Sequence, residues 1–430
     1  MSAIATLRRH WALALAIACA GALSVVIALN FKTAEKEVSE SIPRLYNVGD
    51  PQFARTMSVL LGPPIVGGNR YEVLRNGEEI FPAMLDAIRH AQRTIDFETY
   101  IYWSGDIGKT FADALAERAH AGVKVHVLLD WLGSQKIDRA IIEEMARAGV
   151  EVQRYHALRW YDLARLNNRT HRKVLVVDGR VGFTGGVGIA PEWTGHAQDA
   201  DHWRDTHFRV EGPVVAQMQA VFLDNWLKTT GAVLHGEEYF PAVAPAGHGD
   251  AQMFMSSPTG GSESMHLMYL LAITAAQRSI YLSMAYFVPD DLAVKALRDA
   301  LARGVRVEII VPGPITDTQT VRRASRELWG PLLQAGVKFY EYQPTMYHCK
   351  VMVVDGLMTS VGSTNFDNRS FRLNDEANLN IYDADFARRQ IEIFEDDRAR
   401  SRAYTYDDWL NRSLKDKALD WLASALRLQL

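Results

Sequence analysis

THRKVLVVDGRVGFTGG, at Thr170–Gly186, and YHCKVMVVDGLMTSVGS, at Tyr347–Ser363, are two versions of one segment. Each contains the pattern His-x-Lys-x-x-x-x-Asp, in which an apolar run separates the lysine from the aspartate. An apolar run that ends in Asp-Gly is typical of a buried strand that enters a hairpin turn. We therefore expect two hairpins, which turn at Asp178-Gly179 and at Asp355-Gly356.

The repetition extends beyond this segment. Three further pairs occur in the same order: AIRHAQRTIDFETYI (Ala87–Ile101) with AITAAQRSIYLSMAY (Ala272–Tyr286), GVKVHVLLD (Gly122–Asp130) with GVRVEIIVP (Gly304–Pro312), and AGVEVQRYH (Ala148–His156) with AGVKFYEYQ (Ala335–Gln343). Four matches in one order are not chance, so the chain contains a duplicated domain.

Each copy has the pattern of an α/β fold. Apolar strands expected at residues 94–102 and 123–129 flank a helix expected at residues 112–121. Strands that are apolar throughout need helices on both faces of their sheet. We predict two tandem domains, each a mixed β-sheet flanked by helices. The expected divisions are an N-terminal anchor (1–32), a linker (33–68), the first domain (69–240), an inter-domain linker (241–262), the second domain (263–405) and a C-terminal amphipathic helix (406–430).

The first 32 residues contain an uncharged apolar run. As a helix, the run from Trp11 to Leu29 would extend about 28 Å, close to the hydrocarbon thickness of a bilayer. We predict an uncleaved transmembrane helix; a cleaved signal peptide and a helix buried in a soluble core are the alternatives. Because Arg8 and Arg9 precede the run and only Lys32 follows closely, the positive-inside rule favours a catalytic body outside the cytoplasm. This predicts a single-pass protein of the bacterial inner membrane.

Net charge and cysteine content narrow the possible functions. The formal net charge is −4 and no long basic run occurs, which disfavours bulk binding of nucleic acid. The two cysteines, Cys19 and Cys349, are not expected to form a disulfide. We interpret Cys349 as a packed core thiol.

The C-terminal segment from residue 406 departs from the repeat. Its apolar residues, including Leu414 and Trp421, recur at helical spacing. We expect this helix to pack on the second domain; the alternative is a helix that lies on the membrane surface.

The candidate catalytic residues are His171, Lys173, His348 and Lys350. On a strand, side chains two residues apart project from one face, so each histidine and its lysine are expected to point the same way. A neutral imidazole can attack the phosphorus of a phosphodiester, and an imidazolium can protonate the departing alkoxide. Two lysines can stabilise the charge on the non-bridging oxygens. No HExxH, DxD or clustered Cys/His set stands in these segments, so we expect no metal and no cofactor.

Asp178 and Asp355 complete the two motifs and belong to the candidate catalytic set on that ground. Each opens a hairpin turn, however, which favours a local structural role over a reactive one.

The doubled motif resembles the phospholipase D superfamily, and the finer pattern resembles bacterial cardiolipin synthases. The segments that carry the finer resemblance are FETYIYW (Phe97–Trp103), WRDTHFRVEGP (Trp203–Pro213), AYFVPD (Ala285–Asp290) and GSTNFDNRSFRLNDEAN (Gly362–Asn378). The resemblance covers about Pro63 to Trp421. It implies two halves related by a pseudo-twofold axis, with both His-Lys pairs in one central cleft.

The resemblance also implies roles for four further residues. Ser363 and Asn365 are similar to the family's phosphate-contacting pair. Glu376 occupies the place of a carboxylate that orients the first histidine, and Asp205 occupies the comparable place in the first half. A turn or surface position is the alternative for each carboxylate.

The first half departs from the family pattern at two positions. TGGVGIAPEW places Gly186 and Gly188 where the second half has a serine and an asparagine. The first half is therefore expected to supply fewer side-chain hydrogen-bond donors. This difference bears on which alcohol the site accepts.

These features predict a phosphatidyltransferase that joins two phosphatidylglycerols into cardiolipin and releases glycerol, through a phosphohistidine. By the resemblance, His171 is the nucleophile, and His348 is the general acid and then the general base. A phospholipase D hydrolase, or another headgroup transferase, is the main alternative, and a nuclease is a less favoured one. Both motifs are intact, which disfavours a non-enzymatic membrane scaffold. The expected partners are phosphatidylglycerol and the bilayer, without nucleic acid.

Overall fold

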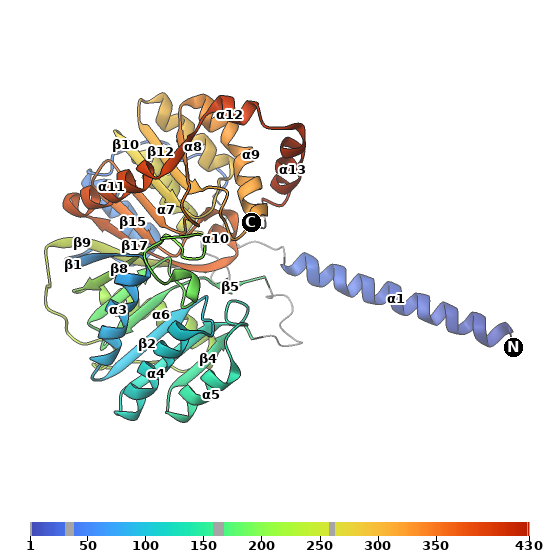
Figure 1. Cartoon of the computed structure of the whole chain (residues 1–430), viewed down its shortest axis with the longest axis horizontal. Coiled ribbons are helices and arrows are strands. Elements are labelled where there is room, and N and C mark those ends of the chain that lie inside the picture. Colours follow the sequence, from blue (N-terminus) through green and yellow to red (C-terminus); the bar gives the residue numbers. More distant parts are fainter. Residues whose placement is uncertain (1, 31–37, 158–166, 258–262, 428, 430) are drawn as a thin grey trace.

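A computed structural model describes residues 2–30, 38–157, 167–257, 263–427 and 429. Parts of the predicted anchor, of both predicted linkers and of the C-terminal segment lie outside these residues. Two halves form the body of the protein, and the helix α1 (Ser2–Asn30) extends away from it (Figure 1). Within the described residues, no helix is both long enough and apolar enough to be assigned as a membrane span.

Each half contains a similar series of elements. The first half has β1 (Val66–Arg75), α3 (Asn76–Arg89), β2 (Thr94–Thr99), α4 (Asp106–His120), β3 (Lys124–Asp130), α5 (Arg139–Arg147), β4 (Glu151–Tyr155), β5 (Arg169–Thr170), β6 (Val174–Val177), β7 (Val181–Gly185), the 3-10 helix η2 (Pro191–Trp193), β8 (Thr206–Glu211) and α6 (Val215–Thr230). The second half has β9 (Gly249–Ser256), α7 (Ser264–Ala275), β10 (Ser279–Met284), β11 (Phe287–Val288), α8 (Asp291–Ala302), β12 (Arg306–Pro312), α9 (Gln319–Ala335), β13 (Lys338–Tyr342), β14 (Lys350–Val354), β15 (Met358–Gly362), β16 (Phe366–Asp367), α10 (Asn368–Arg372), β17 (Asn374–Tyr382), α11 (Ala384–Ala399), β18 (Ser401–Tyr404), α12 (Tyr406–Leu410) and α13 (Leu414–Ser424).

One mixed sheet runs through both halves. Its strand order is β18-β13-β12-β10-β14-β15-β17-β9-β1-β8-β7-β6-β2-β3-β4. Read outward from the centre, the two sides present corresponding strands of the sequence repeat. The central strands β1 and β9 pair antiparallel, with Val66 opposite Ala251. Antiparallel pairing of corresponding strands is what a twofold axis at the centre of a sheet requires. The predicted α/β class is confirmed, and the strand order reflects the duplication.

Helices cover both faces of the sheet. On one face, α3, α4 and α5 enclose a core in the first half, and α7, α8 and α9 enclose a separate core in the second. On the opposite face, α6 and α11 lie over a third core that crosses from one half to the other and includes Val176, Met253 and Val353. Separating the halves would expose this apolar surface, so the third core holds them in one position.

Asp178 and Asp355 have the same local role in the two hairpins. Their φ values are 54° and 57°, and the glycine after each also has a positive φ, which is the geometry that Asp-Gly predicts for these turns. Each carboxylate accepts hydrogen bonds from three successive backbone N–H groups, those of Gln92, Arg93 and Thr94 for Asp178 and those of Gln277, Arg278 and Ser279 for Asp355. The two aspartates therefore fix the starts of β2 and β10.

The predicted linkers contain regular elements, which corrects that part of the prediction. The segment at residues 33–68 includes α2 (Pro51–Leu61), which Asp50 caps by accepting from the backbone N–H of Gln52 at 2.7 Å. Phe53 and Met57 of α2 are buried in the core of the second half. The segment at residues 241–262 includes β9, a central strand of the sheet. The glycines and prolines of these segments lie at the ends of short elements. The sequence analysis interpreted them as signs of continuous linkers.

Two predicted helices also have different bounds. The helix expected at residues 112–121 begins earlier, at Asp106, because Gly105 with φ 129° turns the chain into it. The single helix expected at residues 406–430 is two helices, because Ser413 interrupts it and caps α13 by accepting from the backbone N–H of Asp416 at 3.1 Å. Both α12 and α13 pack against α9 of the second half.

Candidate active site

The two histidines lie where their strands begin. β6 starts at Val174 and β14 at Lys350, so the strand predicted for each whole motif begins only after its histidine. The backbone N–H of His171 donates to the carbonyl of Asp375 at 2.9 Å, and that of His348 donates to the carbonyl of Arg204 at 2.8 Å. The backbone of the opposite half therefore holds each histidine in place.

A carboxylate from the opposite half also binds each imidazole ring. Nδ1 of His171 lies 2.9 Å from Oε1 of Glu376, and Nδ1 of His348 lies 2.7 Å from Oδ2 of Asp205. The structure thus places Glu376 and Asp205 at the contacts that the resemblance implies. Because an ionised carboxylate only accepts, Nδ1 of each ring carries the hydrogen. The lone pair of a neutral ring is then on Nε2.

Burial and charge set the protonation states of this group. Burial lowers the pKa of His171 to about 4, against the opposing effect of Glu376. Burial also lowers the pKa of His348, and Lys350 adds to that effect. Burial alone would raise the pKa values of Glu376 and Asp205, but the facing histidines hold both below the usual range. His171 is therefore neutral at pH 7 and the carboxylates are ionised.

Each lysine folds back onto its own histidine. Nζ of Lys173 donates to the carbonyl of His171 at 2.7 Å, and Nζ of Lys350 donates to the carbonyl of His348 at 2.8 Å. Burial lowers the pKa of Lys173 to about 7 and also lowers that of Lys350. An entering phosphodiester anion would restore their full charge, because a nearby anion stabilises the ammonium.

The two halves support their carboxylates differently. The hydroxyl of Ser363 donates to Glu376, and Nδ2 of Asn374 donates to Oε1 of Glu376 at 3.3 Å. At the corresponding position in the first half, a Cβ on Gly186 would lie 2.3 Å from Oδ1 of Asp205, so a serine there would displace this carboxylate. Asp205 instead accepts from the indole N–H of Trp193 at 2.9 Å. The departure at Gly186 thus follows from the position of the carboxylate.

One cavity of about 570 Å³ contains both histidines. Three aromatic rings pack beside them: Tyr100 lies 5.2 Å from His171, and Trp193 and Trp203 lie 5.2 Å and 5.4 Å from His348, measured between ring centres. Other residues that line the cavity include Lys173, Asn365, Arg169 and Arg369. Ser363 reaches the site only through Glu376, and Asp178 and Asp355 are not among the residues that line the cavity.

Sequence reasoning assigned no role to the aromatic residues or to Arg169 and Arg369. The only signal for Tyr100 and Trp203 was their presence in the segments that carry the resemblance, FETYIYW and WRDTHFRVEGP. One residue stands between each histidine and its lysine, and neither of these two residues lines the cavity. Arg172 donates to the carbonyl of Val221 on α6 at 2.9 Å, and Cys349 is buried in the core.

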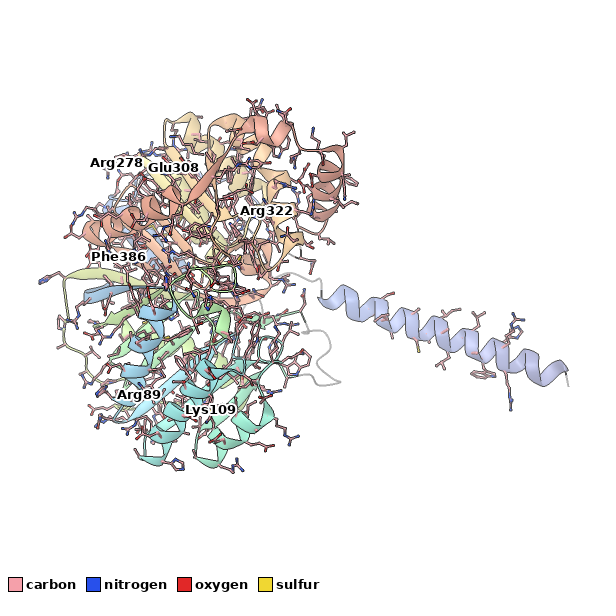
Figure 2. All side chains as sticks on the ribbon, in the orientation of Figure 1. Arg89, Lys109, Arg278, Glu308, Arg322 and Phe386 are labelled. Atoms are coloured by element: carbon pink, nitrogen blue, oxygen red, sulfur yellow. The ribbon has the colours of Figure 1, made fainter. Side chains whose placement is uncertain are left out.

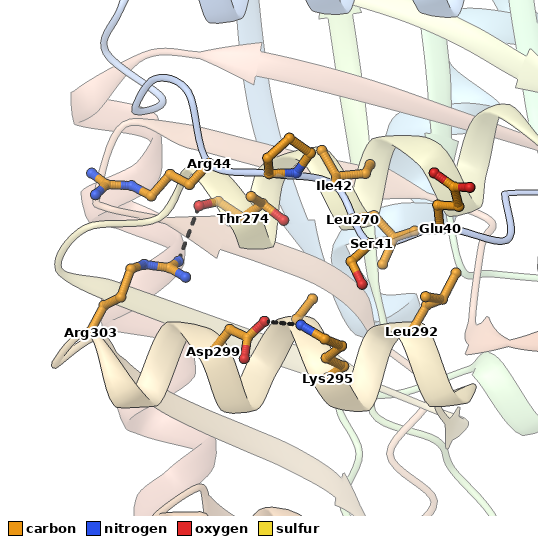
Figure 3. Close-up of a pocket in the computed structure, with 12 residues that line it drawn as sticks. Glu40, Ser41, Ile42, Arg44, Leu270, Thr274, Leu292, Lys295, Asp299 and Arg303 are labelled. Carbon is orange, nitrogen blue, oxygen red and sulfur yellow. Dashed lines mark hydrogen bonds and ion pairs between the residues drawn. The ribbon is translucent and has the colours of Figure 1, made fainter.

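A second cavity, of about 270 Å³, lies between residues 40–44 and the helices α7 and α8 (Figure 3). Arg303 at its edge donates to the carbonyl of Thr274 at 3.1 Å, and Lys295 pairs with Asp299 at 2.6 Å. It contains neither His-Lys pair. In the described part of the chain, no group of three His, Cys, Asp or Glu side chains is arranged to hold a metal ion.

A doubled His-Lys site between two similar halves of one sheet defines a phospholipase D-like protein. The chain belongs to the family described as cardiolipin synthase, PLD-like domain, whose model matches residues 84–226 and 269–398. The family resemblance drawn from the sequence is confirmed.

Individual relatives agree with this assignment. A cardiolipin synthase of Geobacillus thermodenitrificans (strain NG80-2) is 39% identical over 334 residues, which are 77% of this chain and 66% of that protein. Cardiolipin synthase 2 of Bacillus anthracis is 37% identical over 325 residues, which are 75% of this chain and 63% of that protein. The match thus spans just under two thirds of these relatives' length.

A solved structure has the same fold. The phosphatidylserine synthase of Haemophilus influenzae Rd KW20 matches 88% of this chain and 100% of its own, with a TM-score of 0.69 and 15% identity. At this identity the similarity concerns the fold alone.

The lowered pKa of Lys173 predicts how activity varies with pH. Above about pH 7, Lys173 loses the charge that binds the phosphate, so kcat/KM should fall, approaching about tenfold per pH unit. On the acid side, His171 stays neutral down to about pH 4, so activity should persist to about pH 5. The measurement is kcat/KM for bis(p-nitrophenyl) phosphate, whose leaving group needs no proton.

Lys173→Arg provides the matched comparison. Arginine keeps its charge at every accessible pH, so this variant should shift the alkaline decline upward. A wild-type profile that stays flat to about pH 9 would contradict the role given to Lys173.

Proposed function

We propose that the protein is a phosphatidyltransferase that joins two phosphatidylglycerols into cardiolipin and releases glycerol. The crossed contacts carry this proposal: two histidines in one cavity, each bound through Nδ1 by a carboxylate of the other half. The cardiolipin synthases similar to this chain support the choice of substrate. Apolar side chains at the cavity, those of Ile101, Leu132 and Val321, are suited to a lipid.

The first step transfers the phosphatidyl group to the protein. Nε2 of neutral His171 attacks the phosphorus of the donor lipid, a P–N bond forms, and the P–O bond to glycerol breaks. The imidazolium of His348 gives its proton to the departing oxygen, so glycerol leaves as a neutral alcohol. Lys173 and Lys350 stabilise the non-bridging oxygens, and Glu376 stabilises the positive charge that the ring of His171 acquires.

The second step transfers the phosphatidyl group to the acceptor. Neutral His348 takes the proton of a primary hydroxyl of a second phosphatidylglycerol, whose oxygen attacks the phosphorus. The P–O bond forms as the P–N bond breaks, which returns His171 to its neutral form and leaves His348 protonated. Water in place of this alcohol would give phosphatidic acid, the product of the hydrolase alternative. No metal or cofactor takes part in this scheme.

We also propose that α1 holds the enzyme at the bacterial inner membrane as a single-pass protein, with the body outside the cytoplasm. Trp11, Leu15 and Ile17 on α1 are large exposed apolar side chains. The body has a second such surface on α13, where Leu414 is 85% and Trp421 64% exposed. α13 lies on the side of the body toward which α1 extends (Figure 1). Such surfaces are suited to contact with a bilayer.

The substrate proposal predicts two products in equal amounts. Purified protein given phosphatidylglycerol in detergent should form cardiolipin and release one glycerol for each cardiolipin, and EDTA should leave the rate unchanged. His171→Ala should lower this rate by about a thousandfold or more, because the transfer depends on its nucleophile. Phosphatidic acid as the sole lipid product would favour the hydrolase, and a lost rate restored by one divalent ion would refute the metal-free scheme.

The division of labour between the histidines predicts opposite phenotypes on a nitrophenyl phosphodiester. Because nitrophenolate departs without a proton, His348→Ala should still form an acid-labile phosphoenzyme, whereas His171→Ala should form none. The adduct should persist in His348→Ala, since no base activates the incoming alcohol. The measurement is acid-quenched labelling of the protein. A labelled His171→Ala with an unlabelled His348→Ala would exchange the two roles.

The membrane proposal predicts where the chain is found in cells. It should sediment with the inner membrane, and protease added to intact spheroplasts should digest the body, because the body faces outward. Immunoblotting of the fractions measures both. Full protection of the body would reverse the orientation, and recovery in the soluble fraction would refute the attachment.

A further inference from the structure

Two arginines line the cavity in addition to His171, Lys173 and His348. Arg169 belongs to β5 in the first half, and Arg369 belongs to α10 in the second. β5 pairs in parallel with β17, which places Arg169 opposite Asn374, two residues before Glu376. The two arginines therefore come from opposite halves to one cavity beside the site, as the two histidines do.

Both guanidinium groups donate their hydrogen bonds to uncharged oxygen atoms. Nη1 of Arg169 donates to the carbonyl of Asn168 at 2.7 Å, and its Nε is buried without a hydrogen-bond partner in the described residues. Arg369 donates from Nη2 to Oδ1 of Asn167 at 2.8 Å, from Nη1 to the carbonyl of Asn167 at 3.3 Å, and from Nε to the carbonyl of Gln429 at 3.0 Å. Several donors of the pair are thus left for a ligand.

Neither arginine has a carboxylate within salt-bridge distance among the residues that the structure describes. Two carboxylates have charges that act on the pair, Asp367 on Arg369 and Asp130 on Arg169. Both are engaged elsewhere. Asp367 accepts from the backbone N–H of Ser370 at 2.7 Å and caps α10, and Asp130 accepts from the backbone N–H groups of Leu132, Gly133 and Thr170. Burial raises the pKa of Asp367 to about 6, which further limits it as a counter-ion. Asp317, also at the cavity, binds the hydroxyl of Tyr286. Two partly buried cations that form no salt bridge among the described residues favour the binding of an anion.

We propose that Arg169 and Arg369 bind the phosphodiester of the acceptor lipid, the phosphate that the reaction leaves intact. This inference rests on the proposed synthesis of cardiolipin and extends it to recognition of the acceptor. The two His-Lys pairs act on the phosphate of the donor lipid, whose bond to glycerol breaks. The phosphate of the acceptor lipid therefore needs cations of its own. Arginine is suited to this task, because its planar fork matches two phosphate oxygens.

The chemistry of the acceptor limits where its phosphate can lie. A three-carbon glycerol joins that phosphate to the hydroxyl that attacks, so both must occupy the same cavity at once. The volume of about 570 Å³ lies in the range of sites that hold whole small molecules, and it extends from His348 to both arginines. Water and free glycerol have no phosphate, so these arginines would do nothing for them as acceptors.

The test compares two acceptors on one enzyme. Arg169→Gln and Arg369→Gln are assayed as full-length protein for cardiolipin formation from phosphatidylglycerol and, separately, for exchange of labelled glycerol into phosphatidylglycerol. Exchange uses the same phosphohistidine but an acceptor without a phosphate. Cardiolipin formation should fall by about tenfold or more relative to exchange, through a raised KM for the acceptor. The matched control is Arg89→Gln, an exposed arginine at the surface of the first half (Figure 2), which should change neither rate.

Arg169→Gln is the decisive variant, because within the described residues the Arg169 side chain makes a single hydrogen bond to the protein, the one to Asn168. An unchanged KM for the acceptor in this variant, or an equal fall of both rates, would overturn the proposal. A wild-type protein that exchanges glycerol and forms no cardiolipin would instead refute the proposed function itself, so the two failures are distinguishable.

Discussion

Each histidine is held by a carboxylate of the other half, and the rest of the structure depends on this crossed arrangement. Glu376 can reach His171, and Asp205 can reach His348, only while the two halves keep one relative position. The continuous sheet and the core that crosses it under α6 and α11 fix that position. Neither half contains a complete site. Duplication thus supplied two equivalent histidines, and their pairing across the centre made them one site.

Because the site is buried, the charge of its lysines depends on whether an anion is bound. Breaking a buried ion pair by removing one partner typically costs about 3–5 kcal/mol, so a group of this kind persists only if its charges balance. Here the negative charges of Glu376 and Asp205 act on the two lysines as well as on the histidines that they bind, while burial keeps His171 neutral. Lys173, with its pKa lowered to about 7, is poised between its charged and neutral forms. A bound phosphodiester would favour the charged form of Lys173, so binding of the proposed substrate would complete the charge of the site.

The two halves are similar, but they give their histidines different surroundings. The Glu376 carboxylate is supported by Ser363 and Asn374, whereas the shorter Asp205 fills the space beside Gly186 and accepts from Trp193. His348 also lies against two indole rings, and His171 against one phenol ring. These differences provide a physical basis for unequal roles within a site that its sequence makes nearly symmetric.

The sequence alone determined the features that depend on local patterns. Periodicity and repetition predicted the α/β class, the duplication and the two Asp-Gly hairpins, because the order of apolar and turn residues along the chain directly specifies them. The doubled motif also made His171, Lys173, His348 and Lys350 the candidate catalytic residues, and this assignment stays a prediction. The extents of short elements such as α2 and β9 were missed, because their stability comes from burial against distant residues.

Only the tertiary structure decided which residues meet. The spacing of His171 and Glu376, 205 positions apart, contains no information on their contact, and the resemblance alone suggested it. Arg169 carried no local signal, because an arginine beside a strand usually faces solvent. The only signal for Arg369 was its place in GSTNFDNRSFRLNDEAN, one of the segments that carry the resemblance. Their place in the cavity follows from the pairing of β5 with β17 across the halves. The contacts between the halves depend on how the sheets of the two copies join. This joining exists only in the folded chain.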